Sequence, residues 1–144
     1  MTHINSNGQN GIVHIRKPQC HFGWDWGPVL PCSGISDDIY LEFVNEGRID
    51  DFSVSQVCNI TDATVDAKID YTSYKDCECK IILTSPSGEV LISDGNYAHF
   101  EIENPELWWT YDLYEKLEQP LYTVTAELLC DGCVVDECSK KIGI

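Results

Sequence analysis

The chain has 144 residues, enough for one compact domain of ordinary size, and 43% of them are hydrophobic, so it has material for a buried core. Its net charge is −15, from 24 acidic and 9 basic side chains, which disfavours nucleic acid and anionic membrane surfaces as partners. No apolar run reaches the ~20 residues that a membrane-spanning helix requires. We therefore expect a folded domain with neither nucleic-acid nor membrane partners.

The N-terminal third does not read as a complete domain. Residues 1–11 are polar and rich in Asn and Gly, without the charged and apolar regions of a signal peptide, and are predicted to be a flexible lead-in. Within residues 12–48, the strand-like stretches GIVHIRK and DIYLEFV flank a loop that crowds Trp24 and Trp26 around Asp25. Two strands alone cannot bury a face stably, so this segment is interpreted as the C-terminal remnant of another domain.

Residues 49–144 have the pattern of a β-sheet protein. ATVDAKIDYT alternates apolar and polar residues, as a strand with one solvated face does. CKIILTS and EVLIS are joined by Ser85-Pro86-Ser87-Gly88, and the last two strands by Asp131-Gly132, a dipeptide typical of tight hairpin turns. About seven short strands without a convincing helix predict an all-β fold, an immunoglobulin-like antiparallel β-sandwich, although the Cys…Trp…Cys spacing of antibody domains is missing.

Two of these strands leave the inward face open to interpretation. In DFSVSQVCNI the alternation of Phe52 and Val54 continues at Val57 only after a break in phase. In NYAHFEIEN the candidates for the inward face are Tyr97, Ile102 and either His99 or Phe100. The following PELWWTYDLYEKLEQP is predicted to be irregular.

The chain has eight cysteines, which could bind a metal, form disulfides or remain free thiols. Cys77 and Cys79 would point to one face of a strand, and Cys130 and Cys133 would lie opposite each other across the Asp-Gly turn. Because strand and hairpin geometry explains this spacing, thiols in a reducing cytosol are favoured, and with them a cytoplasmic location. A small zinc-binding β domain using these four cysteines is the alternative.

The loop carries a family resemblance. RKPQ at 16–19, FGWDWGP at 22–28, Pro31 and SGI at 33–35 resemble the end of the N-terminal sugar-binding jelly-roll domain of β-mannosidases, which are family-2 glycoside hydrolases. ENPELWW, followed by QPLYTVTAEL, an Asp-Gly hairpin and a terminal IGI, is similar to the immunoglobulin-like domain that follows the jelly roll in these enzymes.

The resemblance implies that catalysis occurs elsewhere in the parent protein. In the family, a (β/α)₈ barrel holds both catalytic glutamates, and a barrel takes about 250 residues. The chain is thus expected to be a non-catalytic scaffold between the sugar-binding domain and that barrel, with no catalytic residue, metal or cofactor of its own. Asp25 is expected to accept hydrogen bonds from a terminal β-mannoside in the intact retaining glycosidase, with Trp24 and Trp26 as an apolar wall.

Two further expectations follow. Trp108 and Trp109 could form the platform of an independent carbohydrate-binding module, but consecutive residues of an extended segment point opposite ways, which favours structural packing. The relatives usually continue with Pro and a Gly-containing turn after these tryptophans, whereas this chain has TYDLYEKL, so a helical turn is an alternative. Without partner strands, residues 12–48 are expected to be poorly ordered or tied into a homodimer or swapped arrangement.

Overall fold

The computed structural model describes Arg16, residues 19–23, Pro28, and residues 32–113 and 119–144. The chain divides into two compact units, Met1–Glu42 and Phe43–Ile144. The lead-in and all of GIVHIRK except Arg16 lie outside the described residues. Within the described part, no helix is long and apolar enough to cross a membrane.

The expected strand DIYLEFV, residues 38–44, is wrong for this structure. The segment has no regular secondary structure, and Ile39, Leu41 and Phe43 are 75%, 85% and 86% exposed. A strand persists when a neighbour pairs with its backbone N–H and C=O groups, and none of the strands that the structure describes pairs with these residues. The regular element described in the first unit is a short 3-10 helix, η2 (Gln19–Phe22).

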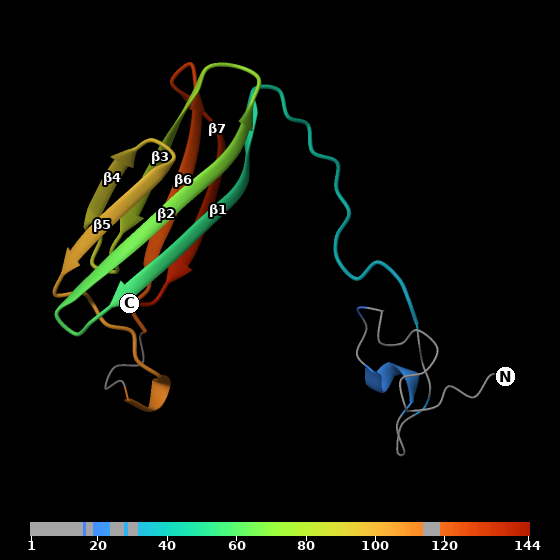
Figure 1. The fold of residues 1–144 in the computed structure, drawn as a ribbon, viewed down its shortest axis with the longest axis horizontal. Helices are drawn as coiled ribbons and strands as arrows, with labels where there is room; N and C mark the ends of the chain where they lie inside the picture. The colour runs from blue at the N-terminus through green and yellow to red at the C-terminus, as the bar shows by residue number, and fades with distance from the viewer. Residues whose placement is uncertain (1–15, 17–18, 24–27, 29–31, 114–118) are drawn as a thin grey trace. The chain divides into compact units, whose positions relative to one another are not determined.

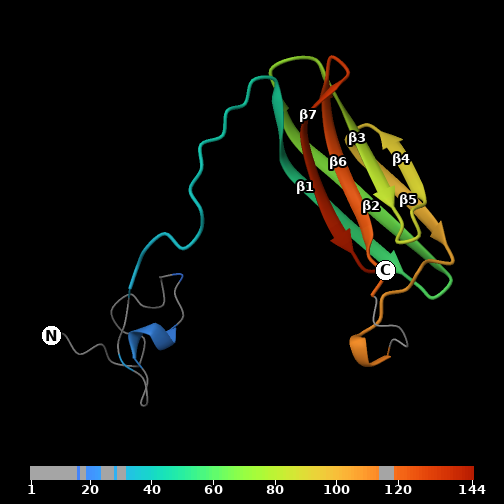
Figure 2. The same cartoon turned by 180° about the vertical axis from the view of Figure 1, so that it is seen from behind.

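The second unit is a two-layered antiparallel β-sandwich (Figure 1). Its strands are β1 (Gly47–Cys58), β2 (Asp62–Ser73), β3 (Cys77–Thr84), β4 (Val90–Asp94), β5 (Tyr97–Glu103), β6 (Tyr122–Cys130) and β7 (Cys133–Ile142). One sheet has the order β1-β2-β5 and the other β4-β3-β6-β7, and the view from behind shows the second layer in front (Figure 2). The predicted all-β sandwich is confirmed.

The core lies between the two sheets and follows the period-two pattern of the sequence. Alternate residues of β2 and β6 are buried, while the residues between them are more exposed. Burial of one Val, Leu or Ile side chain contributes about 1.5–3 kcal/mol, so this shared face provides much of the driving force for folding. The fully buried side chains include Val65, Ile69, Ile81, Leu83, Val124 and Leu128.

Both predicted hairpins form. Asp131 and Gly132 have φ values of 52° and 78°, and the left-handed conformation at both central positions is that of a type I′ turn between β6 and β7. Between β3 and β4, the N–H of Gly88 donates to the carbonyl of Ser85 at 3.0 Å, and the N–H of Ser85 donates to the carbonyl of Glu89 at 2.8 Å. These turns fix the registers of β3 with β4 and of β6 with β7.

Two strands differ from the expected facing. On β5 the buried residues are Ala98 and Phe100, so Tyr97 and His99 lie on the outer face. On β1 the break in phase occurs earlier than predicted, at a bulge between Ile49 and Asp51, and Val57 is exposed. A bulge adds one unpaired residue and shifts the alternation, which local apolar patterns cannot locate.

Candidate functional site

The sugar-binding residues predicted from the sequence, Trp24, Asp25 and Trp26, lie outside the described residues. The described chain immediately before them ends η2 at Phe22 and continues into Gly23 with φ of 109°, a conformation that suits glycine.

The tryptophan pair lies in the irregular segment between β5 and β6. The N–H of Trp108 donates to the carbonyl of Ile144, and a Cβ on Gly143 would lie 2.9 Å from Cβ and Cγ of Trp108. Trp108 therefore packs directly on the backbone at the end of β7, where only glycine fits. The backbone carbonyl of Trp109 accepts from Nε2 of Gln119 at 2.7 Å, and the Trp109 side chain is 46% exposed, so the packing role is observed for Trp108.

A helical turn follows the tryptophans, η3 (Tyr111–Leu113). This agrees with the alternative inferred from the departure of TYDLYEKL from the family pattern. Residues 114–118 lie outside the part of the chain that the structure describes.

Tyr122 anchors the crossover from β5 to β6. It is the first residue of β6 and only 3% exposed, and its hydroxyl oxygen accepts a hydrogen bond from the N–H of Glu106 at 2.8 Å. A tyrosine at the start of this strand that is bonded to upstream backbone resembles the tyrosine corner of immunoglobulin-like sandwiches, although here the bonded N–H lies 16 residues upstream rather than a few. Burial raises the pKa of the Tyr122 hydroxyl, which keeps it neutral.

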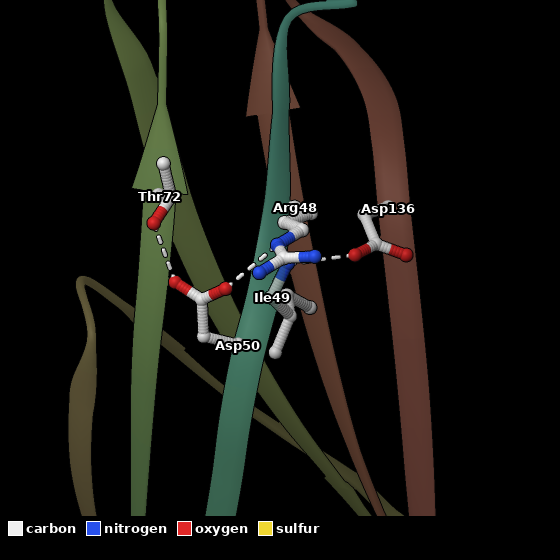
Figure 3. Close-up of polar contacts among 5 residues, drawn as sticks. All are labelled: Arg48, Ile49, Asp50, Thr72 and Asp136. Carbon is white, nitrogen blue, oxygen red and sulfur yellow. Dashed lines mark hydrogen bonds and ion pairs between the residues drawn. The ribbon is translucent and has the colours of Figure 1, made fainter. Parts of the chain in front are cut away.

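Polar groups join the two sheets along one open edge (Figure 3). The N–H of Ile49 on β1 donates to Oδ2 of Asp136 on β7 at 2.7 Å. Beside it, Asp50 accepts from Oγ1 of Thr72 at 2.6 Å and from Nε of Arg48 at 2.7 Å. The hydrogen bond from Thr72, and then the one from Arg48, lower the pKa of Asp50. This cluster fastens β1 to β2 and β7, and its role is structural.

A second polar cluster lies on the outer face of the three-stranded sheet. Oδ1 of Asp66 on β2 lies 2.6 Å from the hydroxyl of Tyr97, which donates to it, and 2.7 Å from Nδ1 of His99. The Tyr97 hydrogen bond, followed by that of His99, lowers the pKa of Asp66, and the hydrogen bond to Asp66 raises the pKa of His99. The sequence shows these residues at polar positions, but only the register of β2 with β5 brings them together.

Acidic side chains of the sandwich line one cavity and also occur in the polar clusters described above. A cavity of about 260 Å³ between the sheets is lined by Glu89, Glu101, Glu103 and Glu106 among others. A glycosidase needs a carboxylic acid whose raised pKa lets it protonate the leaving group. The pKa values of Asp50, Asp62 and Asp66 are all lowered, so these three carboxyl groups are unsuited to act as the proton donor.

Two of the cysteines depart from the expectation of free thiols, whereas Cys79, Cys133 and Cys138 are free. Cys77 and Cys130 form a disulfide between β3 and β6, with Cα atoms 4.3 Å apart. Two of the four sulfurs considered for zinc are thereby oxidised, and among the described residues no group of three or more His, Cys, Asp or Glu is placed to hold a metal ion. The sequence alone does not predict this disulfide, because it does not define the register of β3 with β6 that brings the two cysteines together. The disulfide also removes these two residues as support for a reducing cytosol.

Known proteins share both parts of the chain. The family model for glycosyl hydrolases family 2 matches residues 39–144, and the model for the glycosyl hydrolase 2 galactose-binding domain-like family matches residues 2–37. Beta-mannosidase B of Aspergillus terreus is 30% identical over 155 residues, which cover 98% of this chain and 17% of that protein. Beta-mannosidase B of Aspergillus clavatus is 33% identical over 149 residues, which cover 96% of this chain and 17% of that protein.

Solved structures agree with the fold. The crystal structure of Ruminococcus gnavus beta-glucuronidase is similar with a TM-score of 0.55 and 25% identity, over 69% of this chain and 16% of that one. The chain thus spans about a sixth of the length of the relatives it matches. The matched segments include the sandwich and the aromatic loop.

Proposed function

This chain belongs to glycosyl hydrolases family 2, and we propose that it is the non-catalytic β-sandwich of a β-mannosidase-like enzyme, together with the end of the sugar-binding domain that precedes it. The sandwich, residues 49–144, would separate the sugar-binding domain from the catalytic barrel and contact both within the parent protein. Residues 12–48 would be the end of the jelly roll.

The match of residues 39–144 to the family, on a segment that folds as a sandwich, carries this proposal. A (β/α)₈ barrel takes about 250 residues, more than the 144 of this chain, so the chain has no room for one. The beta-mannosidase B relatives support a β-mannoside as the substrate of the parent. The packing of Trp108 on Gly143 favours this scaffold over an independent carbohydrate-binding module.

In the intact enzyme, Asp25 would hold the terminal sugar rather than break its bond. A carboxylate accepts hydrogen bonds from sugar hydroxyls, and the indoles of Trp24 and Trp26 would cover the apolar C–H face of the ring. In a retaining glycosidase the bond is broken by two other carboxyl groups, about 5–5.5 Å apart. Orientation of the sugar by Asp25 would place the scissile bond between them.

The test is made in the full-length parent protein. Its reading frame should continue from this segment into a barrel, and the protein should release 4-nitrophenol from 4-nitrophenyl β-mannoside. Asp25→Asn should lower kcat/KM about 10- to 100-fold, the value of a charged hydrogen bond, whereas Asp38→Asn should leave it unchanged. A parent without a barrel, or an Asp25→Asn enzyme with unchanged kcat/KM, would contradict the proposal.

A further inference from the structure

Three cysteines lie side by side across three neighbouring strands. Cys77 on β3 is the register partner of Cys130 on β6, and Cys130 is the register partner of Cys133 on β7. Directly opposed residues of an antiparallel pair place their side chains on the same face of the sheet. Since β6 lies between β3 and β7, Cys130 is the central member of a row of three.

The same central cysteine suits two alternative disulfides. The residues that flank a two-residue hairpin turn exchange both backbone hydrogen bonds, so Cys130 directs its N–H and C=O toward Cys133. Its pair with Cys77 is then the non-hydrogen-bonded kind, which agrees with the Cα separation of 4.3 Å. A hydrogen-bonded pair has Cα atoms about 5.5 Å apart, which is also within the range of disulfides.

We propose that Cys77, Cys130 and Cys133 form a thiol–disulfide exchange site. The thiol of Cys133 loses its proton to solvent, and the thiolate attacks Sγ of Cys130. The bond between Cys130 and Cys77 breaks as the new bond between Cys133 and Cys130 forms, and Cys77 leaves as a thiolate that takes up a proton. One disulfide is consumed and one is made, so the step requires neither oxidant nor reductant.

The strand order favours this displacement. An attacking sulfur approaches a disulfide sulfur from the side opposite the leaving sulfur, and Cys133 and Cys77 lie on opposite sides of Cys130. Cys133 is a free cysteine and is exposed to solvent. The other cysteines of this sheet are poorer attackers, because burial raises the pKa of both Cys79 and Cys138.

The exchange changes what the disulfide holds together. The Cys77–Cys130 bond closes a sequence separation of 53 residues and joins the start of β3 to the end of β6. A Cys130–Cys133 bond closes only the Asp131-Gly132 turn. Because a cross-link that closes a longer loop constrains the unfolded chain more, exchange keeps the number of disulfides but replaces a long-range cross-link by a local one, and the start of β3 is no longer covalently joined to β6.

The exchange is tested by mapping disulfides in the whole chain. The oxidised protein is incubated at pH 8 without added thiol, quenched in acid, blocked at its free thiols, and analysed by mass spectrometry of its peptides. In the native isomer, with the Cys77–Cys130 disulfide, the blocking group is on Cys133. In the exchanged isomer, with the Cys130–Cys133 disulfide, it is on Cys77. In the wild-type chain, we expect the fraction of Cys77 that carries the blocking group to grow with time to a plateau. In Cys133→Ser this fraction should remain at its zero-time level. In Cys138→Ser it should grow as in the wild type.

A second variant tests whether the alternative bond fits the sheet. Oxidised Cys77→Ser should contain the Cys130–Cys133 disulfide. The proposal is overturned if Cys130 and Cys133 both remain thiols in that variant, or if the wild-type block stays on Cys133 throughout. It is also overturned if blocking of Cys77 grows equally in Cys133→Ser, since another thiol would then be the attacker.

Discussion

The backbone N–H of Ile49 donates a hydrogen bond to the carboxylate of Asp136 at 2.7 Å, across the two sheets of the sandwich (Figure 3). Both strands carry a bulge at this place, in β1 between Ile49 and Asp51 and in β7 opposite Leu128 and Leu129. β1 and β7 are both edge strands, which leave backbone groups unpaired. The Asp136 side chain satisfies one such group and closes this side of the sandwich.

Replacement of Asp136 by Ala should therefore destabilise the fold by about 1–3 kcal/mol, because a half-buried N–H loses a charged acceptor. Asp136→Asn should cost less, since the amide oxygen can still accept. The free energy of unfolding is measured in urea, with the neighbouring exposed acid changed in Glu137→Ala as the control. Equal stability of Asp136→Ala and Glu137→Ala would show that the bond does not hold the sheets together.

Tyr122→Phe should lower the free energy of unfolding by about 1–3 kcal/mol, since it leaves the N–H of Glu106 without its acceptor while keeping the buried ring. The matched change Tyr111→Phe alters a tyrosine that is 66% exposed and should have little effect. Urea unfolding of both variants gives the comparison. If the two substitutions cost the same, the hydrogen bond from Glu106 to Tyr122 contributes nothing specific.

His99 should titrate with a pKa above the usual value of about 6.5, because its hydrogen bond to Asp66 favours the protonated ring. Titration of the His99 ring protons by NMR measures this pKa directly. In Asp66→Asn the pKa should fall toward the usual value. An unchanged pKa in that variant would exclude Asp66 as the cause.

The same pair makes stability depend on pH in two windows. The stabilisation from His99 is complete below about 6.5 and is lost as pH rises through its higher folded pKa. The stabilisation from Asp66 is present above about 3.9 and is lost as pH falls through its lower folded pKa. The free energy of unfolding of His99→Gln should therefore lie below that of wild type at acidic pH, and the difference should shrink as the pH rises above neutrality. Urea unfolding at a series of pH values measures this difference.

The exposed apolar segment is expected to drive self-association. Ile39, Leu41 and Phe43 are each at least 75% exposed, and unpaired apolar segments of this kind pair readily with another copy. Light scattering after gel filtration should detect dimers that the double substitution Leu41→Lys/Phe43→Lys abolishes. Ser33→Lys/Ser36→Lys adds the same charge to the same segment and should leave the dimer intact. A wild-type chain that is monomeric at every concentration would contradict this expectation.

The sequence predicted what depends on local pattern. The alternation in β2 and β6 and the Asp131-Gly132 turn follow from short-range chemistry, and each forms as expected. The aromatic loop carries the resemblance to glycosyl hydrolases family 2, the family to which the chain belongs. Its Trp24-Asp25-Trp26 site remains a prediction.

What the sequence did not predict depends on which strands become neighbours. The Cys77–Cys130 disulfide, the Asp66–His99 pair and the Ile49–Asp136 bond each join residues far apart in the chain. These contacts follow from the register of strands and from bulges, which one sequence does not define. The missing strand at residues 38–44 has the same origin, because strand formation requires a partner.

The chain folds as a β-sandwich, and the proposed function assigns it no catalytic site of its own. The most direct measurement is the release of 4-nitrophenol from 4-nitrophenyl β-mannoside by the isolated chain. We expect no release above the buffer blank from protein that is folded by circular dichroism. Turnover that copurifies with the chain through a second purification would contradict it.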